Sequence, residues 1–426
     1  MKLQFEEWIF GQDIPFQAQE SIKEAILCYK ASAYRSALLF SYLCFQIVIR
    51  ERLLGAQNPK DFPPSGWEDI QNKLRRDDKW DAQVFDAIIM NSNGKEIFII
   101  TDDLRNQVRY WRDRRNDCAH LKSNTINFSH VESFWTFLQC NLFKFMVNGS
   151  KQALLEKISK HFDIRITKPN TNFNTIIKEI PFALNDYEHL VFLEEAHQIL
   201  CNQIGDSYYH DDCPSTRFWE ALFSINSEPF LENLITFLLS QKELSIGLID
   251  VYPKLINYFS GEPTFIRQLW FDLLYSVLFI NENRIFCALL RNNLIPSDQV
   301  IEAIDRFILK SSSWIEEIND SDLIVLKENR FFERLKDYIF KKNDFLNFEW
   351  ANKKVNLIIF CLKFCDFDAD MVQEITSTFS SSHFPFKLCN HLKTFFNENK
   401  TQRENYLLIA KNEGLIPPKE LGFDEE

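Results

Sequence analysis

The chain has 426 residues, of which 46% are hydrophobic and 15% aromatic, so it is long enough for two or three domains and too apolar for general disorder. Its formal net charge of −12 disfavours general nucleic-acid binding and confines any contact with a polyanion to a local basic patch. Phe is abundant whereas Gly and Pro are sparse, which favours an all-α fold over a turn-rich β-sandwich.

The first strong helical pattern covers residues 20–54. Its apolar spacing predicts two consecutive helices, or one broken helix, with a turn at Ser32–Ala33. Residues 37–49 are apolar almost all round, so the second helix is expected at the centre of a bundle. Gly55 ends this helix, and a loop with three prolines follows at 58–66.

The next segments complete a compact bundle of four or five helices. Residues 67–90 predict two short helices, 91–94 a turn, and 95–101 either a strand or the entry to the next helix. A basic, aromatic helix is expected at 103–122 and an aromatic closing helix at 131–147. We expect a domain boundary near residue 150.

The charge distribution supports that boundary. Residues 1–150 contain 19 basic and 19 acidic side chains, so the whole negative charge belongs to residues 151–426. This second domain is expected to be helical, with a junction at 162–185 that begins with a β-like stretch. Helices are expected at 230–239, 244–259, 264–279, 299–309, 355–365, 387–396 and 402–410.

The succession of helices in residues 151–426 is compatible with an α-solenoid, although the sequence has no period of the kind that repeat families show. A regulatory or interaction role, with a protein partner or inhibitor, is expected for this part. The N-terminus lacks the apolar run of a signal peptide, and no stretch of about 18 residues stays apolar. The ten cysteines show no pairing pattern, so we expect a soluble cytoplasmic protein without membrane contact.

The helix at 103–122 has two distinct sectors at about 100° per residue. The apolar sector consists of Leu104, Val108, Trp111, Cys118 and Ala119. The basic sector beside it consists of Arg105, Arg109, Arg112, Asn116 and His120. Arg115 falls in the middle of the apolar sector, and because a guanidinium keeps its charge, it needs a partner, a ligand or a function.

The pattern of Arg115, Asn116 and His120, with three residues between the last two, resembles the catalytic signature of the HEPN superfamily. These are small α-helical bundles, and many of them are metal-independent ribonucleases. Residues 25–52, in which Tyr-Arg-x-Ala opens the second helix, resemble the first hairpin of such proteins. The resemblance covers residues 15–147, about a third of the chain.

The resemblance implies an endoribonuclease without cofactor or metal, which acts as a homodimer whose two motif helices build one composite site. It also implies a role as a toxin or as an antiviral abortive-infection effector. The products would be a 2′,3′-cyclic phosphate and a 5′-hydroxyl. Which RNA is cut is not implied.

The chemistry of the residues fits RNA cleavage without a metal. His120 has a side chain that transfers protons near neutral pH, and Arg115 offers a fork for phosphoryl oxygens. Asn116 is placed to orient the imidazole or to hold a phosphate oxygen. Arg115 and His120 lie about 140° apart on an ideal helix, so we expect a partner protomer to cover the apolar sector and complete the site. Candidate phosphate contacts are Arg105, Arg109, Arg112 and Arg114.

Each of these residues also has a structural interpretation. Arg115 would pair with Asp86 or Glu51, His120 would complement the helix dipole, and the arginine stripe would be solvated surface. Tyr34 and Arg35 are interpreted as packing residues of the hairpin. The alternative function is a non-catalytic HEPN module for dimerisation or nucleotide binding, joined to a helical scaffold for protein interaction.

Other motifs carry less chemistry. The pair Glu194 and His197, and residues 210–213 (His-Asp-Asp-Cys), contain metal-ligand types without a completing partner. Cys361 and Cys365 are four positions apart, which is not the spacing of a zinc knuckle. No Gly-rich phosphate loop, nucleophile elbow or zinc-protease motif is present in the sequence, so neither a metal nor a cofactor is expected.

Overall fold

The computed structural model describes residues 3–12, 14–59, 62–91, 96–120, 124–168, 171–204, 213–275, 281–310, 318–341 and 347–423. These residues are predominantly helical and include no β-strand, which confirms the expected all-α class. One isolated antiparallel bridge joins Phe98 to Val147. The chain divides into two compact units, Met1–Ser240 and Gln241–Glu426. None of the described helices is both long and apolar enough to span a lipid bilayer.

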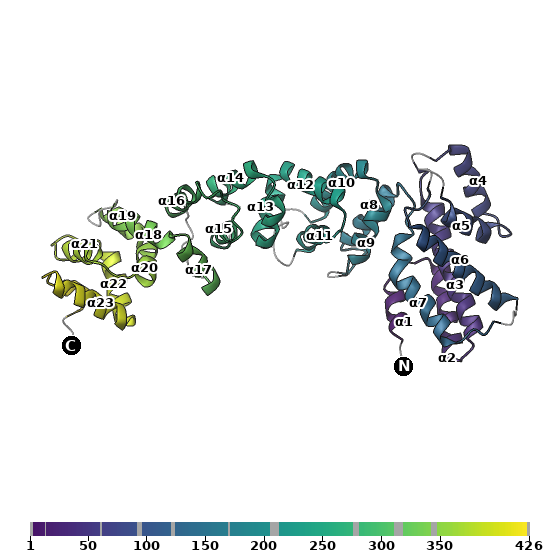
Figure 1. The fold of residues 1–426 in the computed structure, drawn as a ribbon, viewed down its shortest axis with the longest axis horizontal. Helices are drawn as coiled ribbons and strands as arrows, with labels where there is room; N and C mark the ends of the chain where they lie inside the picture. Colours follow the sequence, from purple (N-terminus) through teal and green to yellow (C-terminus); the bar gives the residue numbers. More distant parts are fainter. Residues whose placement is uncertain are drawn as a thin grey trace. The chain divides into compact units, whose positions relative to one another are not determined.

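The first part of unit 1 is a helical bundle (Figure 1). Its helices are α1 (Gln4–Phe10), α2 (Phe16–Lys30), α3 (Tyr34–Gly55), α4 (Pro64–Leu74), α5 (Trp80–Ile89), α6 (Asp102–Ala119), α7 (Phe128–Asn141) and the 3₁₀ turn η1 (Leu142–Lys144). The predicted turn between the first two long helices is confirmed, and Ser32 adopts a left-handed backbone there (φ 60°). The two short helices expected in 67–90 are α4 and α5.

Helix α3 is the centre of this bundle, as its apolar sequence predicts. It contacts α2, α4, α5, α6 and α7 (Figure 1). Phe45 on α3 is 1% exposed, and its ring lies 5.2–6.4 Å from those of Phe134, Phe137 and Phe145. The closing helix α7 ends at Asn141, earlier than expected, and the chain continues through η1 to the bridge at Val147.

Three arginines of α3 bind backbone carbonyls at the ends of other segments. Arg35 donates to the carbonyl oxygen of Asp117 near the end of α6 (2.9 Å), and Arg50 donates to that of Leu74 at the end of α4 (2.8 Å). Arg52 donates to the carbonyl oxygens of Leu142 and Phe145 after α7. Carbonyls in the last turn of a helix have no partner inside the helix and carry partial negative charge. The central helix therefore caps its neighbours with guanidinium groups.

The rest of unit 1 consists of α8 (Lys151–Phe162), α9 (Asn174–Ala183), η2 (Asp186–Glu188), α10 (His189–Ile204), α11 (Pro214–Leu222) and α12 (Glu228–Ser240). The division expected at residue 150 is not where the chain separates. Glu179 of α9 is 1% exposed and pairs with Arg52 of α3 (3.6 Å), and the amide of Ser150 donates to the carbonyl of Ala183. These contacts attach α9 to the bundle.

Two short segments differ from expectation. The β-like stretch that begins at Phe162 forms turns in its described part, and Asp163 accepts hydrogen bonds from Arg165 there. Between residues 96 and 101, no strand extends beyond the bridge at Phe98. The turn expected at 91–94 lies outside the described residues except for Asn91.

Unit 2 begins with α13 (Lys242–Val251), η3 (Pro253–Phe259), α14 (Pro263–Phe271), η4 (Leu273–Tyr275), α15 (Glu282–Arg291), α16 (Val300–Lys310), α17 (Asp320–Glu328) and α18 (Phe331–Lys336). It continues with the π-helical turn η5 (Asp337–Lys341), α19 (Phe348–Lys353), α20 (Val355–Phe364), α21 (Ala369–Phe379), α22 (Phe386–Glu398), α23 (Lys400–Asn412) and η6 (Lys419–Leu421). The helix expected at 244–259 stops at Val251, because Pro253 cannot donate the next helical hydrogen bond.

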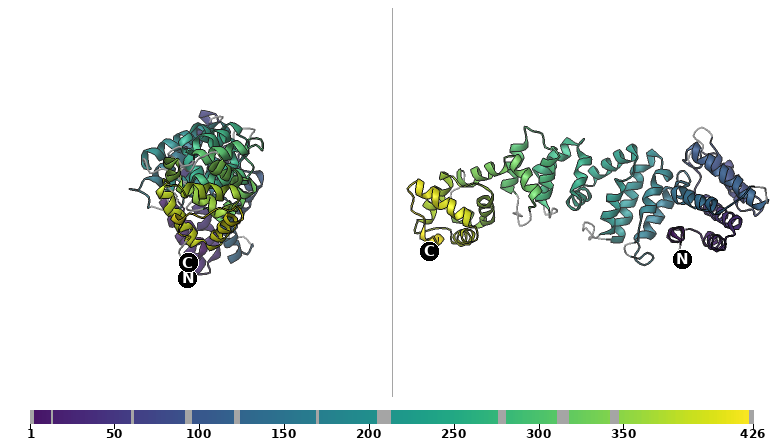
Figure 2. Two further views of the ribbon diagram at one scale, coloured as in Figure 1. Left: turned by 90° about the vertical axis from the view of Figure 1, so that its left-hand side faces the viewer. Right: turned by 60° about the horizontal axis from the view of Figure 1, so that its bottom comes forward.

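Most helices of unit 2 contact the next helix but one: α13 with α15, α14 with α16, α15 with α17, α16 with α18, α18 with α20, α20 with α22, and α21 with α23. In Figure 2, the helices of this unit follow one another in chain order toward the yellow C-terminal end. Polar side chains join these neighbours across similar distances in the sequence. Arg334 pairs with Asp305, Arg291 with Asp322, and Lys336 with Asp368, over separations of 29, 31 and 32 residues. These three pairs therefore join residues about 30 positions apart, although the sequence shows no such period.

Candidate functional site

The motif helix α6 begins where its capping residue predicts. The hydroxyl of Thr101 accepts a hydrogen bond from the amide of Leu104 (3.3 Å), and Asp102 and Asp103 occupy the first turn. These features stabilise a helix start. The helix ends at Ala119, and the amide of His120 makes the last helical hydrogen bond, to the carbonyl of Asn116 (3.0 Å). The expected end at Lys122 lies outside the described residues.

The apolar sector of α6 is covered by the chain's own helices. Leu104, Val108, Trp111 and Cys118 are buried, and α6 contacts α3. The Trp111 ring lies 5.0 Å from that of Phe134 on α7. The expectation that a partner protomer covers this sector is therefore wrong, because the bundle core already fills it. Ala119, placed in the same sector, is exposed at the helix end.

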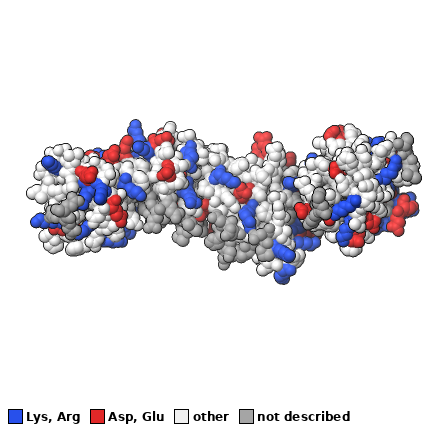
Figure 3. Space-filling model, turned by 90° about the horizontal axis from the view of Figure 1, so that it is seen from below, with Lys and Arg blue, Asp and Glu red and all other residues white. Residues whose placement is uncertain are grey.

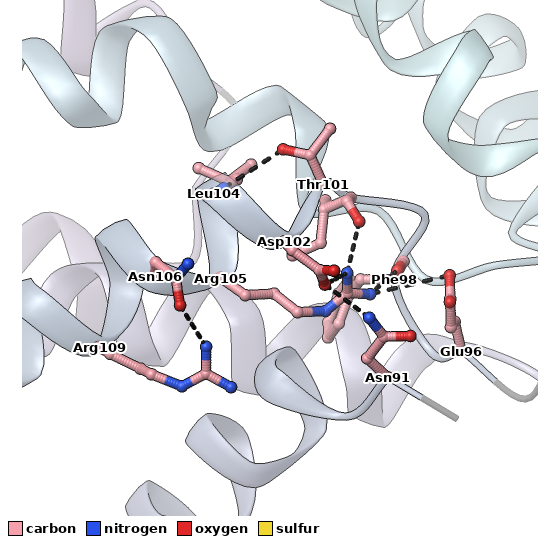
Figure 4. A network of polar contacts seen from close by, with 10 residues as sticks. Asn91, Glu96, Phe98, Thr101, Asp102, Leu104, Arg105, Asn106 and Arg109 are labelled. Atoms are coloured by element: carbon pink, nitrogen blue, oxygen red, sulfur yellow. Dashed lines mark hydrogen bonds and ion pairs between the residues drawn. The ribbon is translucent and has the colours of Figure 1, made fainter. Parts of the chain in front are cut away.

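Arg105 is a structural residue and not an exposed phosphate ligand. Its side chain is buried, and its guanidinium donates to the carbonyl oxygens of Ile100 (2.6 Å) and Phe98 (3.2 Å) (Figure 4). Asp102 lies 3.2 Å away and Glu96 3.8 Å away, so carboxylates balance its charge. The expectation that Arg105 contacts phosphate is wrong, because the segment before α6 folds over this side chain and buries it.

The other three arginines have different surroundings. Arg109 is exposed and donates to the side-chain oxygen of Asn106 (2.6 Å). The guanidinium of Arg112 lies 3.7 Å from the ring centre of Phe85 on α5, a cation–π arrangement. Arg114 pairs with Asp117 (3.0 Å). On the face of the molecule drawn in Figure 3, basic and acidic side chains are interspersed and form no broad area of one sign.

Arg115 contacts the next residue of the motif. Its Nη1 donates to Oδ1 of Asn116 (3.1 Å), and its Nη2 lies 3.7 Å from Oδ2 of Asp81 at the start of α5. This ion pair joins two helices of the same bundle, which is the kind of contact that the structural interpretation of Arg115 expects. The acidic partner is Asp81, however, and not Asp86 or Glu51. Because Arg115 is 31% and Asp81 45% exposed, such a pair contributes about 0–1 kcal/mol and leaves the guanidinium accessible.

A buried hydroxyl lies near Arg112 and Arg115. Tyr42 of α3 is 2% exposed, and its hydroxyl has no hydrogen-bond partner among the described residues. Burial raises the pKa of Tyr42 to about 12, although the charges of Arg112 and Arg115 act to lower it. The hydroxyl therefore stays neutral at physiological pH and does not compete with a phosphate for these cations.

Two residues that the sequence reasoning did not assign to the site make contacts with the segments before and after His120. Asp117 is buried, and its carboxylate accepts from Arg114 (3.0 Å) and from the side-chain amide of Asn124 (2.9 Å). Arg35, interpreted as a packing residue, donates to the backbone carbonyls of both Asp117 and Asn124. An acidic residue inside an arginine-rich helix was the available signal for Asp117.

His120 is exposed at the C-terminal cap of α6. Within the described part of the chain, its ring has no hydrogen bond and no contact joins it to Arg115. Asn116 accepts from Arg115 and so serves the arginine side of the motif. One chain therefore brings Arg115 and Asn116 together and leaves His120 apart, as the helix geometry predicts.

The remaining motifs do not form metal sites in the described residues, where no three His, Cys, Asp or Glu side chains cluster. The ring of His197 packs edge-on against the rings of Trp219 and Phe237, which stack on each other. Residues 210–212 are outside the described part. The sulfur atoms of Cys361 and Cys365 are 3.5 Å apart near the end of α20, without further ligand types.

Comparison with protein-family models, with curated proteins and with solved structures yields no match to this chain. The resemblance to HEPN proteins therefore depends on the residues and the order of helices given above.

Proposed function

We propose that the chain is a metal-independent endoribonuclease of HEPN type. The observation that carries the proposal is the exposed end of α6, where Arg115 is held by Asn116 at 3.1 Å and His120 caps the helix in contact with solvent. A purely structural helix end has no need of this set of side chains. The central hairpin and the helical bundle around it supply the rigid support that such a site requires.

In the proposed reaction, the 2′-oxygen of a ribose attacks the adjacent phosphorus atom and the 5′-oxygen leaves. His120 takes the proton from the 2′-hydroxyl or gives one to the leaving oxygen. Arg115 stabilises the negative charge on the phosphoryl oxygens with its fork of N–H donors, and Asn116 orients that fork. The products are a 2′,3′-cyclic phosphate and a 5′-hydroxyl, and no electrons are exchanged with a cofactor.

The proposal includes a homodimer, because His120 and Arg115 do not converge in one chain. Since the apolar sector is already covered, the pairing surface is the exposed face of α6. Its residues follow a helical spacing of three and four positions: Asn106, Arg109, Asp113, Asn116 and His120. Two such faces, packed against each other, bring the His120 side chains of both protomers to one cleft.

The proposed role of residues 151–426 is to sense, restrain or deliver a partner or substrate. The contacts between most helices of unit 2 and the next but one support the α-solenoid interpretation, since solenoids are built from such neighbour contacts. The ten cysteines are free, which fits a reducing cytoplasm. A toxin or antiviral effector remains the proposed biological context, by resemblance alone.

The ion pair between Arg115 and Asp81 favours one alternative, a non-catalytic module in which Arg115 holds α6 against α5. The two functions separate in one experiment: cleavage of RNA in EDTA by the wild type, by His120→Ala and by Arg115→Ala. We expect each substitution to lower kcat at least about 100-fold, the usual contribution of a proton-transfer group for His120 and of a donor to the developing negative charge for Arg115.

His391→Ala is the matched control, since His391 is an exposed histidine on α22 of unit 2 and its loss should leave cleavage unchanged. Cleavage by His120→Ala at the wild-type rate would contradict the mechanism. A monomer in sedimentation at micromolar concentration would contradict the composite site.

A further inference from the structure

The chain on both sides of His120 is held by a single guanidinium group. Arg35 of α3 donates from Nη1 to the carbonyl of Asp117 (2.9 Å), and from Nη2 to the carbonyl of Asn124 (2.8 Å). The first acceptor lies three residues before His120 and the second four residues after it. These two bonds cross 82 and 89 positions of sequence, so they tie the motif to the central helix of the bundle.

A second set of contacts closes the same arrangement. The carboxylate of Asp117 accepts from the side-chain amide of Asn124 (2.9 Å) and from Arg114 (3.0 Å). Asn124 is thus held at its carbonyl by Arg35 and at its side chain by Asp117. Asp117 is 3% exposed, whereas Arg114 is 25% exposed and Asn124 lies at the surface, so a buried carboxylate holds two side chains that reach solvent.

The contrast with His120 itself is informative. Its ring is exposed and has no hydrogen bond among the described residues, so nothing in this part of the chain orients the imidazole directly. An acid–base group must be placed accurately, because a displacement of about 1 Å can reduce a rate about 100-fold. Among the described residues, the contacts that constrain His120 act through the backbone on either side of it.

We propose that Arg35 is a positioning residue for His120: its guanidinium fixes the backbone at Asp117 and at Asn124, and thereby sets where the imidazole projects. This inference rests on the proposed ribonuclease function. A lysine cannot replace Arg35, because an ammonium is a point donor, whereas the guanidinium fork reaches two carbonyls at once. Asp117 completes the arrangement from the opposite side through its carboxylate.

The chain contains a matched control on the same helix. Arg50 of α3 is also half-buried and also donates to the carbonyl at the end of a helix, in this case Leu74 of α4 (2.8 Å). The substitutions Arg35→Lys and Arg50→Lys therefore both weaken a guanidinium contact to a carbonyl at a helix end, although Arg50 binds one carbonyl through Nε and also lies over the Trp80 ring (5.0 Å). Only the first of these contacts is next to the motif.

The experiment measures RNA cleavage and hydrogen exchange on the full-length protein and on these two variants, together with Arg35→Ala. For both Arg35 variants we expect kcat to fall about 10- to 100-fold with KM within about twofold, and exchange to accelerate in peptides that cover residues 116–127. Arg50→Lys should accelerate exchange near Leu74 and leave kcat unchanged. Arg35→Lys should retain more activity than Arg35→Ala.

The outcomes separate the inference from the proposed function. Absence of cleavage by the wild type would contradict the ribonuclease, and hydrogen exchange would still show whether Arg35 holds residues 116–127. Unchanged kcat in Arg35→Ala, or unchanged exchange in that segment, would overturn the positioning role. An equal fall of kcat in the Arg50 variant would also overturn it, because the effect would then be general destabilisation.

Discussion

The two compact units of this chain pack their helices in different ways. In the bundle of unit 1, one helix contacts almost all others, and side-chain contacts join residues far apart in the sequence: Arg35 with Asp117, Ser41 with Trp135, and Tyr29 with Glu132, over 82, 94 and 103 positions. In unit 2, the corresponding contacts span 29 to 36 positions. The candidate site occurs where distant segments converge.

This difference has a physical consequence for stability. A central helix such as α3 makes unfolding of the bundle cooperative, because its loss removes a packing partner from each helix that it contacts. Where each helix contacts mainly its neighbours, the free energy of unfolding is closer to a sum of local contributions. A substitution in one helix then affects mainly that helix and its neighbours. The following experiments test the contrast, beginning with the largest expected effect.

Phe45→Ala should destabilise unit 1 by about 3–5 kcal/mol, because it leaves a cavity between α3 and α7. Phe307→Ala in unit 2, where the ring stacks on Phe286 at 4.1 Å, removes a similar side chain. Denaturant unfolding measures the loss of stability, and hydrogen exchange shows where it occurs. For Phe45→Ala, we expect faster exchange over the whole bundle. For Phe307→Ala, faster exchange should be confined to α14–α18.

Phe128→Ala is the control for both, since this ring is 50% exposed and its loss should change stability by less than about 0.5 kcal/mol. The contrast between the two units would be contradicted if Phe45→Ala accelerated hydrogen exchange only near the substitution. It would also be contradicted if Phe307→Ala accelerated exchange throughout unit 2.

Glu179→Gln should destabilise unit 1 by about 2 kcal/mol. The Glu179 side chain is 1% exposed and lies between Arg52 (3.6 Å) and Lys157 (2.6 Å), so the substitution leaves two partly buried cations without their carboxylate. Glu195→Gln is the matched control, because its pair with Lys151 is 40% exposed at the carboxylate and is worth less than about 1 kcal/mol.

The same contact predicts how fragments behave. Residues 1–240 should unfold at a clearly higher temperature than residues 1–150, since the shorter fragment lacks Glu179 and the acceptor carbonyl of Ala183. Equal melting temperatures for the two fragments would instead support a domain boundary near residue 150, as the charge distribution suggests.

Asp368→Asn should cost unit 2 about 0.5–1 kcal/mol at neutral pH, because the pair with Lys336 (2.7 Å) is half-exposed. Burial opposes ionisation of Asp368, but the hydrogen bond from Lys336 and that from the amide of Met371 outweigh it and lower its pKa. The stabilisation is therefore present above the usual carboxyl pKa of 3.8 and is lost as the pH falls through the lowered value. Unfolding of the full chain at pH 7 and pH 3 measures it.

The substitution Asp368→Asn is informative because asparagine still caps α21 through the amide of Met371. The variant should lose only the charge-dependent part, so the difference from the wild type should shrink in acid. A difference that stays constant with pH would show that the cap, and not the ion pair, provides the stability.

The stability of unit 1 should change at a pH closer to neutral. Burial lowers the pKa values of His161, His189 and His197, all in the helices that follow the bundle. Their folded pKa values lie below the usual 6.5, so the neutral rings stabilise the fold above pH 6.5 and this contribution is lost as the pH falls below it.

Hydrogen exchange of α8–α10 at pH 7.5 and pH 5.5, corrected for the intrinsic pH dependence of exchange, measures this smallest effect. His197→Gln should reduce the loss of protection at pH 5.5. Protection that does not change between the two pH values would contradict the assignment.

The sequence predicts the helices well where periodicity is local and poorly where tertiary contacts decide. Residues 37–49 are apolar on all sides, and α3 is indeed central. Arg105 is placed in the exposed sector by its angle on the helix, but residues 96–100 fold over it and bury it. Helical periodicity describes one helix and contains no information about a segment that covers it.

The candidate site shows the same limit. The position of Arg115 in the apolar sector suggests a missing partner, and the structure provides Asp81 and Asn116 near an exposed helix end. Arg35 could not be associated with His120 from sequence, because 82 positions separate it from its first acceptor on α6. The pairs of unit 2 that join residues about 30 positions apart are likewise visible in the structure and not in the residue types.

The three capping arginines of α3 also constrain the order of events during translation. Arg35, Arg50 and Arg52 leave the ribosome before their acceptors, and the last of these, Phe145, follows Arg35 by 110 positions. At a synthesis rate of about 5–20 residues per second, roughly 5–20 s pass between synthesis of Arg35 and synthesis of Phe145. During this time the guanidinium groups of the hairpin remain in water. The nascent bundle therefore remains incomplete, and the proposed nuclease inactive, until the closing helix has been made.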